Sequence, residues 1–324
     1  YEELQKRVDK KIGNSILDLR IKGVVVSKES WRMYPGESLA SHTVGLIGSD
    51  KNNKIAGRYG LERYYEEILS RNSSNSSINV FAEIFSTITS SVFDSESRSG
   101  DIVTSIEPTV QNYLDKIVET TKNKWNSDSM GAIIMDPNDG RIYAISSSPS
   151  FNPNNVKDVT DPKIFSNQIV EGVFEVGSII KPLTIAAGID SRTIDSNFTY
   201  DDTGSMELNG KKISNFDGRA RGKTNVQEIL SQSLNIGTAS VALKMGHEEF
   251  VKYFKSFGLS ELTGIDQPNE QISITRNIES KRDVEIATAS YGQGIALSPI
   301  ATVRALSVLA NGGKLITPHL TTRF

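Results

Sequence analysis

A serine and a lysine three residues apart, Ser178 and Lys181, are the side chains in this sequence best suited to covalent chemistry. A serine hydroxyl is a weak nucleophile at neutral pH and needs a neighbouring base. The lysine supplies one locally, whereas the whole sequence holds only three histidines. The spacing therefore predicts a serine nucleophile served by a lysine base. The same four-residue pattern is also typical of a helix cap followed by a solvated lysine.

The residues after the lysine predict that this pair lies at the start of a helix. Proline is tolerated only in the first helical turn, so a helix over 183–189 must begin near Pro182. Free backbone N–H groups and the positive end of the helix dipole favour negative charge on a serine oxygen there. Lys181 shares a helix face with Ser178, so we expect it to reach back over the hydroxyl. Its ordinary pKa of about 10.4 must fall for it to act as a base, which burial promotes.

Two further polar side chains, Ser233 and Asn235, follow downstream. A helix predicted to run to Leu230 ends before them, and another apolar helix begins after them. We expect Thr224 and Gln227 to form the capping box of the first helix. Residues two apart do not share a helix face, so a loop between the helices would let Ser233 and Asn235 enter one cleft.

Length and composition describe a folded, two-domain protein. The sequence has 324 residues, of which 37% are hydrophobic and 23% are charged, enough for two full cores. The formal net charge of -3 carries no sign of nucleic-acid binding. The absence of cysteine excludes disulfides and thiolate metal sites.

The periodicity of the remaining segments predicts an α+β fold in which helices pack on an antiparallel sheet. Expected strands lie at 21–26, 101–106, 131–136 and 141–147, the last two joined by a Pro-Asn-Asp-Gly turn. Expected helices lie at 8–19, 110–121, 247–257 and 299–311. A Ser/Asn-rich loop at 70–77 precedes the expected domain boundary, which separates domains at 1–99 and 100–324.

Further motifs follow one another in order along the chain, at 32–45, 60–66, 135–140, 148–154, 263–266, 289–294 and 310–313. Together with the Ser-x-x-Lys and Ser-x-Asn motifs they resemble the class B penicillin-binding proteins, the monofunctional peptidoglycan D,D-transpeptidases. The resemblance implies a penicillin-binding, transpeptidase-like domain with an antiparallel sheet and helices on both sides. An elongated pedestal, or dimerisation, domain would precede it.

The resemblance also implies roles for the four polar residues. Ser178 would attack the penultimate D-Ala carbonyl of a peptidoglycan stem peptide, and its own backbone N–H would supply one donor of the oxyanion hole. Lys181 would take the serine proton, and Ser233 would relay a proton to the leaving D-Ala. Asn235 would hold the substrate amide and help fix Lys181. No metal or cofactor is implied.

The family further implies partners and a location. β-Lactams would acylate the same serine, and a polytopic membrane glycan polymerase of the SEDS type would be a partner, with no role for nucleic acid. The protein would lie on the extracytoplasmic face of a bacterial membrane, held by an N-terminal anchor that this chain does not include.

One family motif, a Lys-Thr-Gly strand, should lie downstream of 310–313, where the chain stops. We therefore expect a fragment cut at both ends, with an open cleft and weak or no acylation. Lys223 and Thr224 are followed by Asn225 and precede Ser233, so they do not replace that strand. Two alternatives stay open: a β-lactamase or β-lactam sensor domain, and a non-catalytic scaffold of the cell-wall machinery.

Overall fold

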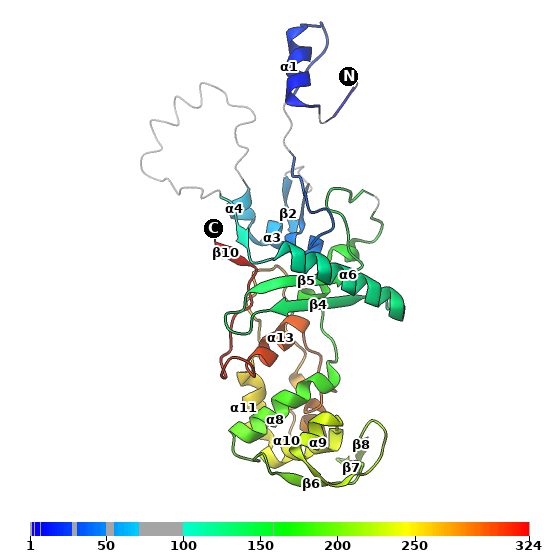
Figure 1. Cartoon of the computed structure of the whole chain (residues 1–324), viewed down its shortest axis with the longest axis vertical. Coiled ribbons are helices and arrows are strands. Elements are labelled where there is room, and N and C mark those ends of the chain that lie inside the picture. The colour runs from blue at the N-terminus through cyan, green and yellow to red at the C-terminus, as the bar shows by residue number, and fades with distance from the viewer. Residues whose placement is uncertain are drawn as a thin grey trace, which may run out of the picture. The chain divides into compact units, whose positions relative to one another are not determined.

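The computed structural model describes residues 2, 4–6, 8–27, 31–49, 55–70, 100–157 and 159–323, which form two compact units, 1–35 and 36–324 (Figure 1). The first unit contains helix α1 (Lys10–Asp18), where a helix was predicted. The strand predicted at 21–26 is wrong, because this segment forms a turn and irregular backbone with no strand paired to it among the described residues. The Ser/Asn-rich loop lies, from residue 71 onward, outside the described residues.

The second unit begins with a small helix-and-hairpin layer. It comprises α2 (Ser41–Val44), β1 (Leu46–Ser49), β2 (Ile55–Tyr59), α3 (Gly60–Tyr64) and α4 (Glu66–Leu69), with β1 and β2 antiparallel. The buried His42 connects this layer to residues more than 100 positions later in the chain. Its Nε2 lies 2.8 Å from the Ile164 carbonyl oxygen, and its ring packs edge-on against Phe151.

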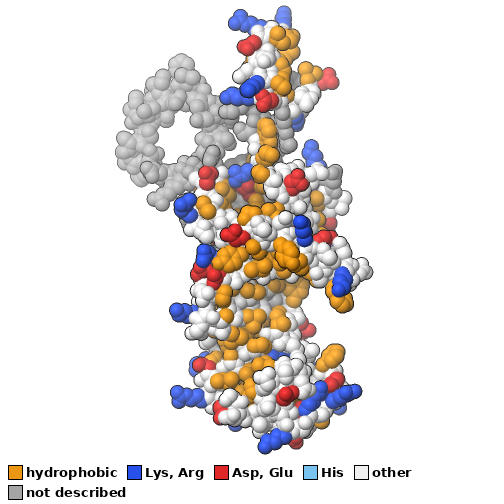
Figure 2. Space-filling model, in the orientation of Figure 1, with side chains coloured by type: hydrophobic (Ala, Val, Ile, Leu, Met, Phe, Trp, Pro, Cys, Tyr) orange, Lys and Arg blue, Asp and Glu red, His pale blue; other side chains and the backbone are white. Residues whose placement is uncertain are grey.

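The predicted hairpin forms the next layer. Strands β4 (Met130–Met135) and β5 (Ile142–Ser148) pair antiparallel, and helix α6 (Pro108–Trp125) packs on them through Leu114 and Val118 (Figure 1). The strand predicted at 101–106 is reduced to β3 (Val103–Thr104), which pairs with β10 (Thr321–Arg323). Apolar side chains reach the surface around α6 and the hairpin (Figure 2), as at Tyr113, which is 67% exposed.

Most of the remaining elements of the unit are helices, which pack around α10 (Asn235–Met245). It contacts α8 (Lys181–Asp190), α9 (Val226–Ser231), α11 (His247–Ser256) and α12 (Asp283–Ala289). The other helical elements are η1 (Pro162–Phe165), α7 (Gln168–Glu171), η2 (Gly177–Ile180), η3 (Arg276–Glu279) and α13 (Pro299–Ser307). Helices therefore pack with antiparallel strand pairs, as the α+β prediction requires. No helix in the described parts of the chain is both long and apolar enough to cross a membrane.

Four short strands that the sequence reasoning missed lie between α8 and α9. They are β6 (Thr199–Asp202), β7 (Ser205–Leu208), β8 (Lys211–Ser214) and β9 (Gly222–Asn225), paired β6 with β9 and β7 with β8. Asn209 and Gly210 join β7 to β8 with positive φ angles of 50° and 73°, an Asn-Gly hairpin signal that the sequence did offer. The predicted capping box is wrong, because Thr224 lies in β9 and the Asn225 side chain caps α9 by accepting from the Glu228 N–H.

Candidate active site

Ser178 and Lys181 lie where the sequence predicted them, at the start of a helix. Ser178 is in the 3-10 turn η2, and Lys181 is the first residue of α8, with Pro182 in the first turn. The Gly177 N–H donates to the Gly292 carbonyl at 3.1 Å, which fixes the residue before the serine. A Cβ on Gly292 would lie 2.1 Å from the Gly177 oxygen, so this close contact requires glycine there. Ser178 is exposed, whereas Lys181 is only 2% exposed.

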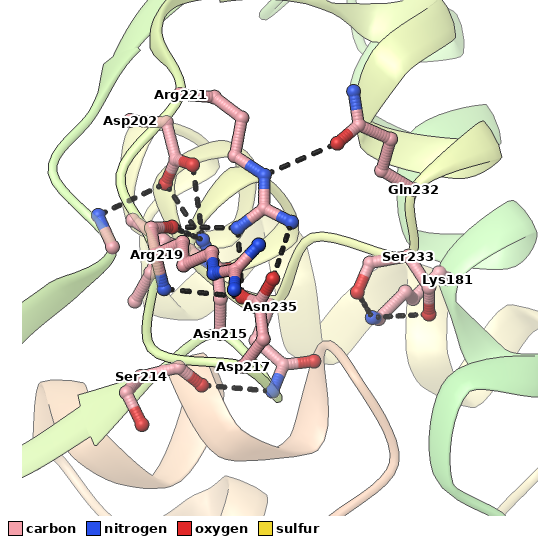
Figure 3. Close-up of polar contacts among 12 residues, drawn as sticks. Lys181, Asp202, Ser214, Asn215, Asp217, Arg219, Arg221, Gln232, Ser233 and Asn235 are labelled. Carbon is pink, nitrogen blue, oxygen red and sulfur yellow. Dashed lines mark hydrogen bonds and ion pairs between the residues drawn. The ribbon is translucent and has the colours of Figure 1, made fainter.

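Lys181 is connected to Ser178 through a third residue. Lys181 Nζ donates to the Ser233 carbonyl oxygen at 2.5 Å and to Ser233 Oγ at 2.9 Å (Figure 3). Ser233 Oγ in turn donates to Ser178 Oγ at 2.9 Å. We expected the lysine to reach directly over Ser178, but its hydrogen bonds go to Ser233. The result is a continuous hydrogen-bonded path from Ser178 through Ser233 to Lys181.

Burial lowers the pKa of this lysine and so raises the share of its neutral form. Loss of hydration disfavours the ammonium form and lowers the pKa of Lys181 from 10.5 to about 8. At pH 7 about a tenth of the molecules would then carry the neutral amine, against fewer than about one in a thousand for an ordinary lysine. The structure therefore meets the condition that the sequence reasoning set for a lysine base.

The end of helix α9 places Ser233. The Leu234 N–H donates to the Ile229 carbonyl and the Ser233 N–H to the Leu230 carbonyl, which is the double hydrogen bond of a Schellman motif. In that motif Ser233 occupies the left-handed position, with a φ of +55°, where glycine is usual. The helix end thus aims the Ser233 side chain at Ser178 and Lys181.

Asn235 lies in the same inter-helix junction, as predicted, but makes a different contact. It is the first residue of α10, and its Nδ2 donates to the Ser214 carbonyl at 2.9 Å (Figure 3). Its side-chain hydrogen bond therefore goes to strand β8, whereas the lysine is held by Ser233. The contact with β8 was not predicted, because Asn235 and Ser214 are 21 residues apart and no local pattern indicates such a contact.

An exposed serine, a bridging serine and a buried lysine are thus hydrogen-bonded in series on this α+β fold. Residues 130–324 match the family model described as the penicillin binding protein transpeptidase domain, and residues 2–104 match the penicillin-binding protein dimerisation domain. The chain belongs to the penicillin-binding protein transpeptidase family. This confirms the class B resemblance, including the combination of a transpeptidase domain with a dimerisation domain.

Curated relatives agree with the family. The chain is 29% identical to the stage V sporulation protein D of Bacillus subtilis over 97% of its length and 48% of that protein's. It is 26% identical to the peptidoglycan D,D-transpeptidase FtsI of Buchnera aphidicola, over 96% of this chain and 53% of the relative. The chain thus spans about half the length of these relatives.

Solved structures share the fold. A putative peptidoglycan glycosyltransferase from Atopobium parvulum superposes with a TM-score of 0.73 at 26% identity, covering 89% of this chain and 64% of that one. Penicillin-binding protein 3 from Mycobacterium tuberculosis superposes with a TM-score of 0.74 at 22% identity, covering 90% and 61%.

Proposed function

We propose that the protein containing this chain is a serine D,D-transpeptidase that cross-links peptidoglycan stem peptides and is acylated by penicillins. The observation that carries the proposal is the hydrogen-bonded path from exposed Ser178 through Ser233 to buried Lys181. It connects a nucleophile to a base whose pKa burial has lowered to about 8.

Acylation follows from this path. With Lys181 neutral, the two hydroxyl groups turn so that Ser178 donates to Ser233 and Ser233 donates to Lys181. Ser178 Oγ then attacks the carbonyl carbon of the penultimate D-Ala while its proton passes by way of Ser233 to Lys181. The Ser178 backbone N–H donates to the developing oxyanion. The carbon–nitrogen bond then breaks, Ser233 donates a proton to the departing D-Ala amine, and Lys181 restores the Ser233 proton. The products are an ester on Ser178 and free D-Ala.

The second half-reaction reverses the roles. An amine of a neighbouring stem peptide attacks the ester carbonyl and gives up a proton by the same path, while Ser178 leaves and is reprotonated.

Asn235 orients the donor peptide, because its Nδ2 is held by Ser214 and its carboxamide oxygen is left to accept from a substrate amide N–H. Substrate binding at this position is thus separate from the placement of Lys181.

The family supports further proposals for the whole protein. Its pedestal domain comprises 1–99 and its transpeptidase domain begins near Gly100. It acts on the extracytoplasmic face of a bacterial membrane through an N-terminal anchor, with a SEDS-type glycan polymerase as its membrane partner.

The test is covalent labelling of the full-length protein by a fluorescent penicillin, with the modified peptide located by mass spectrometry. We expect a stable label on Ser178 that is lost in Ser178→Ala and kept in Ser191→Ala, a matched serine that follows the other end of α8. Rapid release of hydrolysed penicillin would instead identify a β-lactamase. A folded protein that takes no label at all would indicate a scaffold without catalysis.

A further inference from the structure

A buried carboxylate–amide pair lies behind the Ser233–Asn235 junction. Asp202 and Asn215 are 1% and 2% exposed. Asn215 Nδ2 donates to both carboxylate oxygens of Asp202 at 3.0 Å and to the Arg219 carbonyl at 3.2 Å (Figure 3). Because carboxylate oxygens accept hydrogen bonds, the NH2 end of the Asn215 amide faces Asp202. The Asn215 Oδ1 atom is therefore turned the other way.

That oxygen caps the helix on which Asn235 lies. Asn215 Oδ1 accepts from the Ile236 N–H at 3.1 Å, in the first turn of α10. The residue at the N-cap position, Leu234, has no side-chain oxygen to offer, and no side-chain cap bond forms there. Asn215, which is distant in sequence, thus supplies the missing cap. The residue before it, Ser214, accepts a hydrogen bond from the Asn235 side chain through its carbonyl oxygen.

The loop between β8 and β9, which contains Asn215, also contacts the end of α9. Arg221 makes a two-pronged ion pair with Asp217 at 2.7 and 2.8 Å, and its Nε donates to Gln232 Oε1 at 3.1 Å. Gln232 directly precedes Ser233. The Arg221 backbone N–H donates to the Asp202 carbonyl oxygen, which connects the Arg221–Gln232 contact to the buried Asp202–Asn215 pair.

We propose that Asp202 and Asn215 are positioning residues for acylation, which hold Ser233 and Asn235 in register with Ser178. The inference rests on the proposed function and deepens it. Ser233 needs such support because a non-glycine residue at positive φ persists only where its surroundings impose that conformation. Loss of register by about 1 Å at reacting groups can lower a rate by about a hundredfold.

Two variants of the full-length protein test the pair. Asn215→Asp removes the amide N–H donors and places two carboxyl groups side by side in a buried site, where they repel unless the pair takes up a proton. The exchange Asp202→Asn with Asn215→Asp restores one donor and one acceptor, and leaves residue 215 with an oxygen for the Ile236 N–H. Asn311→Ala is the matched control, since Asn311 also makes several hydrogen bonds, to Pro137 and Lys314, in a turn apart from the site.

The measurements are thermal unfolding and the penicillin concentration dependence of labelling, which separates non-covalent affinity from the acylation rate constant. We expect Asn215→Asp to lower the acylation rate constant by about 10- to 100-fold. The double exchange should recover part of that loss, because it restores the contact between 202 and 215 but not the donor to the Arg219 carbonyl. Asn311→Ala should stay within about twofold of the wild type. Asn215→Asp and Asn311→Ala should both lower the melting temperature. If Asn215→Asp does not fold, Asn215→Ala takes its place.

Wild-type acylation in Asn215→Asp, or no recovery in the double exchange, would overturn the inference. A wild-type protein that takes no label would count against the proposed function itself, so the two failures are distinguishable.

Discussion

Position 233 allows the backbone conformation and the chemistry of this site to be tested separately. Ser233 lies at φ +55°, in the left-handed position of a Schellman motif. A side chain there costs about 1–2 kcal/mol relative to right-handed backbone. Glycine avoids this cost but loses about 0.5–1 kcal/mol more in conformational entropy on folding. Ser233→Gly should therefore be more stable than Ser233→Ala by about 0.5–1 kcal/mol, or about 1–2 °C in melting temperature.

Both substitutions remove the same hydroxyl, so both should lose the path between Ser178 and Lys181 equally. We expect the acylation rate constant to fall by about 10²- to 10⁴-fold in each, the usual contribution of a positioned proton-transfer group. The assays are thermal unfolding by circular dichroism and labelling by fluorescent penicillin.

Ser231 is the matched control, since it is the last residue of α9. Alanine should be the more stable substitution there, because glycine costs about 1 kcal/mol in a helix. If Ser233→Ala proved as stable as Ser233→Gly, the left-handed conformation would not be the source of the cost. If either variant kept the wild-type acylation rate, Ser233 would not lie on the proton path.

Three further predictions follow from the buried groups. Because burial lowers the pKa of Lys181 to about 8, the acylation rate should rise with pH up to about 8 and then level off; a flat profile from pH 6 to 9 would exclude Lys181 as the base. Burial also lowers the pKa of His42 below the value of about 6.5 that it has in the unfolded chain, so the folded protein holds the neutral ring. This stabilisation is present above about pH 6.5 and is lost as pH falls. The melting temperature of His42→Gln should therefore lack that part of the pH dependence. A Cβ on Gly237 would lie 2.5 Å from the Ile229 side chain, so Gly237→Ala should lower the unfolding free energy by about 1–3 kcal/mol in a denaturant titration, and an unchanged midpoint would contradict this packing.

Local chemistry made several elements predictable from sequence. The position of Pro182 placed Ser178 and Lys181 at a helix start, and the turn ending in Gly140 placed an antiparallel hairpin. Helix starts and tight turns depend on three or four neighbouring residues, because the backbone angles that these residues allow decide the local conformation. The strand predicted at 21–26 was wrong because an apolar run forms a strand only when a second strand pairs with it.

The sequence by itself thus determined which residues could do chemistry and that Ser233 and Asn235 lie where one helix ends and the next begins. Only the tertiary structure decided that Lys181 bonds to Ser233, 52 residues away, and that Asn235 is held by Ser214. The reason is physical. Hydrogen-bond partners and pKa shifts depend on which distant segments exclude water from a side chain, and no local spacing rule encodes that packing.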